Sequence, residues 1–209
     1  MSEPLDILIK SSIFDRERLL RLSPDYLEFE DKDLKSAPPL RFNADEISAF
    51  RCGVKWINGY EFTIGRIYCV DIKSESNKII SLRLKSIYGI RKELLFKKYF
   101  NIIDSLYDLY FGNKVHQFII DFNQGKVIDI CGVQFSENGV ALDKKSKYFP
   151  WDDVGTKSYQ TYFAIYSKSK PDNYKAFEYN HEWNVWLLPS FSNAILKAKG
   201  YITDENHQE

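Results

Sequence analysis

The chain has 209 residues, and its 29 basic and 29 acidic side chains give a formal net charge of zero. A hydrophobic fraction of 44% and a charged fraction of 28% are typical of a globular protein with a real core, and exclude a disordered chain. The charge balance also argues against attraction to nucleic acid through a large basic surplus. We therefore expect no nucleic-acid partner.

Cellular location is constrained by apolar runs and by cysteines. No apolar run reaches the roughly 18 residues of a membrane span, and the opening MSEPLDILIKSS lacks the layout of a signal peptide. Cys52, Cys69 and Cys131 are far apart and have no CxxC spacing, so they are expected to be reduced thiols. These features predict a cytoplasmic protein without a transmembrane segment.

The first 85 residues alternate apolar and polar side chains as β-strands do. Residues 5–9 form one such run, and a Ser-Pro-Asp turn at 23–25 precedes another at 26–29. The run at 62–72 is rich in β-forming residues, and Gly65 within it predicts a β-bulge. The period then becomes helical between residues 94 and 110.

The next segment is expected to be a short helix. Gly112 is predicted to end the long helix, and Asn113 to cap a second one that ends at Gly125. The β period returns after Lys126, and Asn138-Gly139 predicts a hairpin. Further strands are expected at 161–167, 174–179 and 183–188.

A closing helix is predicted near the end of the chain. Pro189 is expected to end the last strand, and the helix is expected to start at Ser190 or Ser192 and to stop at Gly200. The polar tail at 203–209 is expected to be mobile.

The order of strands, helix, strands, helix indicates an internal duplication. Residues 22–29 align with 135–142, and Phe42 then aligns with Phe149. Phe100, near the first helix, aligns with Phe191. The three matches keep the same order in both halves, which favours two copies of one unit, the second with shorter loops.

Each half contains an aromatic-x-x-acid-acid-aliphatic segment between its first hairpin and its later strands. It reads FNADEI at 42–47 in the first half and FPWDDV at 149–154 in the second. This arrangement resembles the bacterial pleckstrin-homology-like (PH-like) fold. The resemblance implies an α+β, mainly β chain of two tandem units, each an antiparallel β-sandwich or partly open barrel closed by a C-terminal α-helix.

The resemblance also divides the chain. It implies a first PH-like domain at residues 1–112 with a long closing helix, a helical linker at 113–125, a second PH-like domain at 126–202 and a mobile tail at 203–209. Within the segment at 149–154, Trp151 is expected to pack under the hairpin. Asp152 or Asp153 is expected to cap a short turn by accepting backbone N–H bonds.

No group of residues has the spacing of a catalytic or metal site. Adjacent strand residues point to opposite faces, so turn capping explains Asp152 and Asp153 better than acid–base catalysis does. His116 and His181 lie in no metal-binding pattern, and Cys52 has no histidine nearby in the sequence. We expect no enzyme, no metal and no cofactor.

Two groups of residues could bind a partner. Tyr162 and Tyr166 share one face of a predicted strand, and could cover the other unit or form an interaction surface. The second group consists of loop lysines, which are either solubilising residues or, as in the resembled fold, cations that gather around a lipid phosphate. These lysines are Lys144, Lys145, Lys147, Lys168 and Lys170.

The leading hypothesis is a non-enzymatic binding or scaffolding module that acts through protein or peptide contacts. The alternative is binding of phospholipid headgroups on an anionic membrane through the lysine loops of the second unit. An enzyme with an unrecognised site is a third possibility. The sequence leaves the partner and the oligomeric state open.

Overall fold

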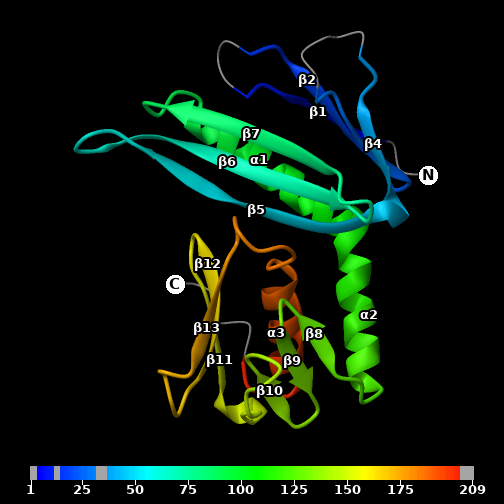
Figure 1. Cartoon of the computed structure of the whole chain (residues 1–209), viewed down its shortest axis with the longest axis vertical. Helices are drawn as coiled ribbons and strands as arrows, with labels where there is room; N and C mark the ends of the chain where they lie inside the picture. Colours follow the sequence, from blue (N-terminus) through cyan, green and yellow to red (C-terminus); the bar gives the residue numbers. More distant parts are fainter. Residues whose placement is uncertain (1–3, 12–14, 32–36, 203–209) are drawn as a thin grey trace. The chain divides into compact units, whose positions relative to one another are not determined.

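The computed structural model describes residues 4–11, 15–31 and 37–202. It is mainly β, with several antiparallel sheets and a helix near the C-terminus, and the described strands form no closed barrel (Figure 1). The chain divides into two compact units between Gly112 and Asn113, called unit 1 and unit 2 below. The predicted mobile tail lies outside the described residues.

The first sheet of unit 1 has the strand order β1-β2-β3-β4, and each strand is antiparallel to the next. Its strands are β1 (Leu5–Ile9), β2 (Arg18–Leu22), β3 (Tyr26–Phe29) and β4 (Leu40–Asn43). The alternation predicted from the sequence holds, since Ile7 and Ile9 are buried while Asp6 is exposed.

A single 3-10 turn, η1 (Ala44–Glu46), leads into the second sheet of unit 1. This sheet consists of β5 (Ile47–Asn58), β6 (Thr63–Ser74) and β7 (Ile79–Ile87), in that order. The register shifts at the end of β5, where Ile57 lies opposite Gly65 and Asn58 opposite Thr63. The expected bulge therefore lies beside Gly65, where a Cβ atom would come within 2.3 Å of a β7 carbonyl oxygen.

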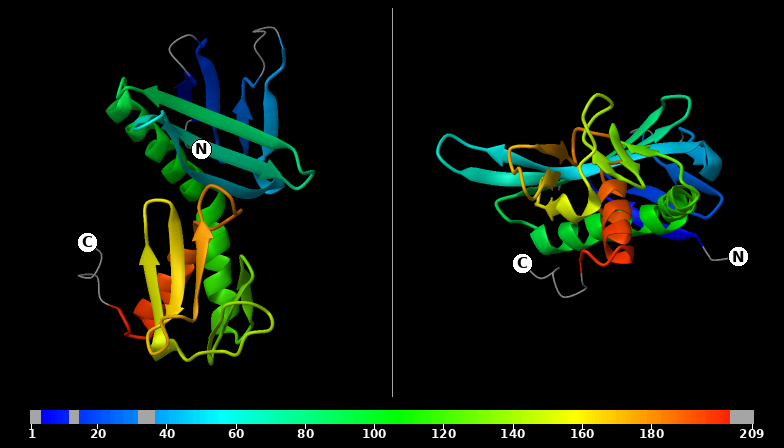
Figure 2. Two further views of the ribbon diagram at one scale, coloured as in Figure 1. Left: turned by 60° about the vertical axis from the view of Figure 1, so that its left-hand side comes forward. Right: turned by 90° about the horizontal axis from the view of Figure 1, so that it is seen from below.

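Helix α1 (Lys92–Leu106) lies along the β5–β7 sheet (Figures 1 and 2). Its apolar face buries residues at helical spacing, and the Tyr99 ring lies 5.2 Å from the Tyr68 ring of β6. The prediction that Gly112 ends this helix is wrong. A π-turn, η2 (Tyr107–Phe111), leads directly into α2 (Gly112–Asn123), because Gly112 has an ordinary helical φ of −58°. The left-handed glycine that follows α2 is Gly125, with φ 81°.

The described residues of unit 2 form two three-stranded antiparallel sheets. The first contains β8 (Ile128–Ile130), β9 (Val133–Ser136) and β10 (Gly139–Ala141), with β9 in the centre. After the 3-10 turn η3 (Trp151–Asp153), the second contains β11 (Val154–Ser158), β12 (Tyr162–Ser167) and β13 (Tyr174–Glu178).

The strand expected at residues 183–188 is absent. This segment forms turns, and helix α3 (Leu187–Ala198) begins before Pro189 rather than after it. Proline is tolerated there because the first turn of a helix has no carbonyl acceptors for its N–H groups. Ser190 and Ser192, expected to start the helix, instead donate their hydroxyls to carbonyl oxygens four residues earlier.

Aromatic rings fill the core of unit 2. Phe191 of α3 lies 5.1 Å from Phe135 of β9 and 5.9 Å from Phe122 of α2, measured between ring centroids. Phe122 also meets Trp151 edge to face at 5.8 Å. The segment expected as a helical linker is a helix, α2, and its Phe122 ring lies in this core.

Candidate functional site: the groove between β1 and α1

The segment at 149–154 is built into the core and the turns of unit 2. Trp151 is 4% exposed, and its indole N–H donates to the carbonyl oxygen of Ser136 at 2.9 Å. Asp153 accepts hydrogen bonds from the Ser167 hydroxyl and, at 2.6 Å, from the Ser169 N–H. These bonds lower the pKa of Asp153, whereas the adjacent Asp152 carboxylate is exposed.

Units 1 and 2 share local features around their 3-10 turns. Just before each turn, a buried phenylalanine pairs with an apolar strand residue: Phe42 with Leu27 in unit 1, and Phe149 with Val140 in unit 2. Just after each turn, the first residue of the next strand pairs with a buried serine: Ile47 with Ser74, and Val154 with Ser167.

The third sequence match is not reflected in packing. Phe100 is 36% exposed, while Phe191 is completely buried. These two residues therefore occupy different environments.

The five lysines considered for lipid binding are exposed on loops that also carry carboxylates. Lys144 lies 3.9 Å from the Asp129 carboxylate, and the Lys168 ammonium donates to the Asp152 carbonyl oxygen. The Asp143 carboxylate accepts bonds from the Ser146 hydroxyl and from two backbone N–H groups of its own loop, which lowers its pKa. The other three lysines of the set are Lys145, Lys147 and Lys170. Carboxylates thus lie close to the lysines of these loops.

The two candidate interface tyrosines contact neighbours inside unit 2. Tyr162 stacks on Tyr159 with ring centroids 4.3 Å apart, and both Tyr162 and Tyr166 are half-buried. The ring of Tyr166 lies over Gly155, where a Cβ atom would come within 2.4 Å of it. Close packing therefore occupies part of this face.

Thiols and possible metal ligands show no reactive arrangement. Burial raises the pKa of Cys52, and it raises that of Cys131 to about 12, so both are poor nucleophiles. Within residues 4–11, 15–31 and 37–202, no cluster of three or more His, Cys, Asp or Glu side chains could hold a metal ion.

A shallow, open groove lies between β1 and α1, beside backbone groups of β1 that no described strand pairs with. This groove has a volume of about 470 Å³ and is lined by residues 5–8 of β1 and by four residues of α1. The helix residues are Leu94, Lys97, Lys98 and Asn101. No prediction from the sequence included this groove.

Strand β1 is an edge strand: on the side away from β2, none of the described strands pairs with it. The outward-facing backbone groups can be assigned. The carbonyl oxygen of Leu19 in β2 accepts from the Glu30 N–H, so the backbone groups of Leu19 face β3. The backbone groups of the next residue, Leu20, therefore face β1, where Leu20 pairs with Ile7. Alternation along β1 then turns the N–H and C=O groups of Asp6 and Leu8 away from β2, toward the groove.

The Lys98 ammonium gives independent support for this assignment, because it donates a hydrogen bond to the carbonyl oxygen of Leu8. Lys98 is half-buried, and burial, followed by the charge of Arg91, lowers its pKa. Lys97 is exposed on the same groove wall.

Apolar side chains complete the groove. Leu8 is 50% exposed and Leu94 is 53% exposed, and they lie on opposite walls. The only carboxylate of the lining is that of Asp6, which accepts two hydrogen bonds from Arg21, both at 2.8 Å. The groove thus combines outward backbone groups, apolar surface and two cations.

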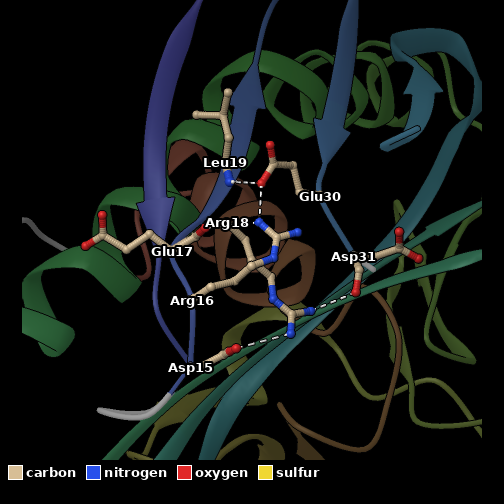
Figure 3. A network of polar contacts seen from close by, with 7 residues as sticks. All are labelled: Asp15, Arg16, Glu17, Arg18, Leu19, Glu30 and Asp31. Atoms are coloured by element: carbon tan, nitrogen blue, oxygen red, sulfur yellow. Dashed lines mark hydrogen bonds and ion pairs between the residues drawn. The ribbon is translucent and has the colours of Figure 1, made fainter. Parts of the chain in front are cut away.

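A polar network holds β2, the strand that pairs with β1 (Figure 3). The Glu30 carboxylate accepts from the Arg16 guanidinium at 2.7 Å and from the Leu19 N–H at 3.3 Å. Arg18 donates to the Asp31 carbonyl oxygen at 2.7 Å. These bonds link β2 and the residues just before it to the segment after β3. The strand that pairs with β1 is therefore held in place by side-chain hydrogen bonds as well as by its ladder.

A second exposed surface lies at the tip of the β5–β6 hairpin. Tyr60 is fully exposed, Phe62 is 65% exposed, and the Arg66 guanidinium lies 4.6 Å from the Trp56 ring. Nothing in the structure indicates what would cover this tip.

The chain was compared with protein-family models, curated proteins and solved structures, and no match was found. None of the helices in the described ranges is long and apolar enough to cross a membrane.

Proposed function

We propose that the chain is a non-enzymatic binding module that takes up an extended peptide segment of a partner protein along the outer edge of β1. The observation that carries this proposal is the outward-facing backbone of Asp6 and Leu8 beside a groove. An edge strand offers its unpaired N–H and C=O groups to an added strand, while neighbouring pockets receive alternate side chains.

The dimensions of the groove fit this mode of binding. At about 3.3 Å per residue, the five residues of β1 would pair with a peptide of similar length. The two outward-facing residues, Asp6 and Leu8, would offer the peptide two N–H donors and two C=O acceptors. Since exposed backbone hydrogen bonds add little net affinity, apolar contacts with Leu8 and Leu94 would supply much of the remainder.

We also propose that units 1 and 2 are tandem PH-like domains that arose by duplication. The shared pairings around η1 and η3 support this, as does the order of sheet, 3-10 turn, three-stranded sheet and helix in each unit. The exposures of Phe100 and Phe191 do not support it.

Headgroup binding through the lysine loops remains the alternative proposal. It has weaker support, because carboxylates on or beside the same loops would repel a phosphate. Catalysis has less support still, since the cysteines whose pKa values are shifted have raised values, opposite to those of nucleophiles.

The test uses the whole chain as bait for a phage-displayed library of random twelve-residue peptides. Recovered peptides are resynthesised with single N-methyl groups placed at successive positions. Strand addition predicts that binding is lost at every second position and kept at the positions between, because only alternate amides face β1. Loss at no position, or at all positions equally, would contradict strand addition.

A further inference from the structure

The hydrogen bond between Lys98 and Leu8 occupies an acceptor that an added strand would use. The Leu8 carbonyl oxygen faces the groove and already accepts from the Lys98 ammonium. A carbonyl oxygen can accept two hydrogen bonds, but a peptide N–H would have to share this one with a charged donor. Strand addition at β1 therefore competes with the bond from Lys98.

The displaced ammonium would need a new partner. Lys98 is half-buried, and among the described residues no carboxylate lies within ion-pair distance of it. Asp6, the one acid of the groove lining, is already held by two bonds from Arg21, and the charge of Glu17 acts on Lys98 without an ion pair between the two. A half-buried ammonium without an acceptor is costly, because it loses water contacts without compensation.

We propose that Lys98 makes the groove selective for peptides with an Asp or Glu side chain beside Leu8. This inference rests on the proposed function. When such a peptide binds, its backbone N–H replaces the ammonium on the Leu8 oxygen, and its carboxylate receives the ammonium. A neutral peptide gains the first bond but leaves Lys98 without its acceptor.

Charge at the groove favours the same class of ligand. Facing the groove are the cations Lys97 and Lys98, and the single anion Asp6 is neutralised by Arg21. A second copy of the chain, paired β1 to β1, would bring two sets of these lysines together, so a separate acidic peptide is the better occupant. Arg91 adds positive charge near Lys98, and Glu17 partly offsets it.

Lys97 provides a matched control. It is adjacent to Lys98 in α1 and lines the same groove, but it is turned about 100° around the helix axis and is exposed. Replacing either lysine by methionine removes one charge and keeps an unbranched apolar chain. Only Lys98→Met also frees the Leu8 carbonyl oxygen.

The experiment pans the same random twelve-residue library on the wild-type chain, on Lys98→Met and on Lys97→Met. We expect Asp and Glu to be enriched at one position in the wild-type and Lys97→Met pools, and not in the Lys98→Met pool. A recovered acidic peptide should bind wild type about fivefold more tightly than its Gln or Asn analogue. Lys98→Met should bind both peptides equally, and the neutral analogue at least as tightly as wild type does.

Each outcome bears on a different claim. Peptides that show the alternating N-methyl pattern without acidic enrichment would overturn the role of Lys98 and leave strand addition standing. Acidic enrichment that persists in Lys98→Met would assign selectivity to another cation and also overturn it. If no peptide is recovered, or if light scattering gives the mass of a dimer in which the outward β1 amides are protected from exchange, both the proposed function and this inference fail.

Discussion

Replacing Trp151 by alanine should destabilise unit 2 by about 3–5 kcal/mol, the usual cost of removing a buried tryptophan and leaving a cavity. The side chain is 4% exposed, stacks on Phe135 at 6.2 Å, and contacts Phe122 edge to face. Its indole N–H also satisfies the Ser136 carbonyl oxygen. Trp151→Phe keeps most of the ring packing but loses that bond, so its cost should be nearer 1 kcal/mol.

The assay must resolve the two units, because a chain with two units need not unfold in one step. Native-state hydrogen exchange read out on the amides of β11–β13 reports the free energy of opening of unit 2. Tyr60→Ala, on the fully exposed hairpin tip, should change stability by less than about 0.5 kcal/mol and serves as the control. A loss below about 1 kcal/mol for Trp151→Ala would refute the claim that this residue anchors the core.

Other predictions concern turns, a helix and the lysine loops. Asp153→Asn should lower stability more than Asp152→Asn, as measured by urea melts at pH 7. Because the pKa of Asp153 is lowered in the folded state, its contribution to the free energy of unfolding should be present above about pH 4 and be lost as the pH falls through the folded pKa. Equal urea midpoints for the two variants at pH 7 would refute this. Gly112→Ala should raise stability by about 0.5–1 kcal/mol, since Gly112 is helical and a Cβ atom would have its nearest contact at 3.4 Å; a destabilised variant would mean strain there. In sedimentation with phosphatidylserine vesicles at physiological salt, the wild-type chain should stay in the supernatant, and replacing the lysines of loop 143–148 should change nothing; salt-sensitive pelleting that this replacement abolishes would instead support headgroup binding.

Apolar periodicity was sufficient to predict most elements of the fold. The alternation in β1 and the helical spacing near Tyr99 reflect burial on one face, which the sequence records directly. The errors came from residues whose effect depends on backbone conformation. Gly112 was expected to end a helix but adopts helical angles, and Pro189 lies in the first turn of α3 instead of ending a strand.

The groove was harder to predict, because it joins residues about 90 positions apart in the chain. The sequence held one signal: Leu8 is an apolar residue on the otherwise polar face of its strand. In the structure its side chain is 50% exposed. Whether β1 would be an edge strand, and whether a helix would run beside it, depends on sheet order. Sheet order follows from long-range pairing, which local patterns do not encode.

Residue-resolved hydrogen exchange of the β1 amides, with and without a recovered peptide, tests strand addition most directly. In the free chain, the amides of Asp6 and Leu8 should exchange faster than those of Ile7 and Ile9, whose N–H groups face β2. Saturation with the peptide should slow exchange at Asp6 and Leu8, and leave Arg41 at the opposite edge of the same sheet unchanged. Saturable peptide binding that leaves Asp6 and Leu8 unprotected would contradict the proposal that the partner adds a strand to β1.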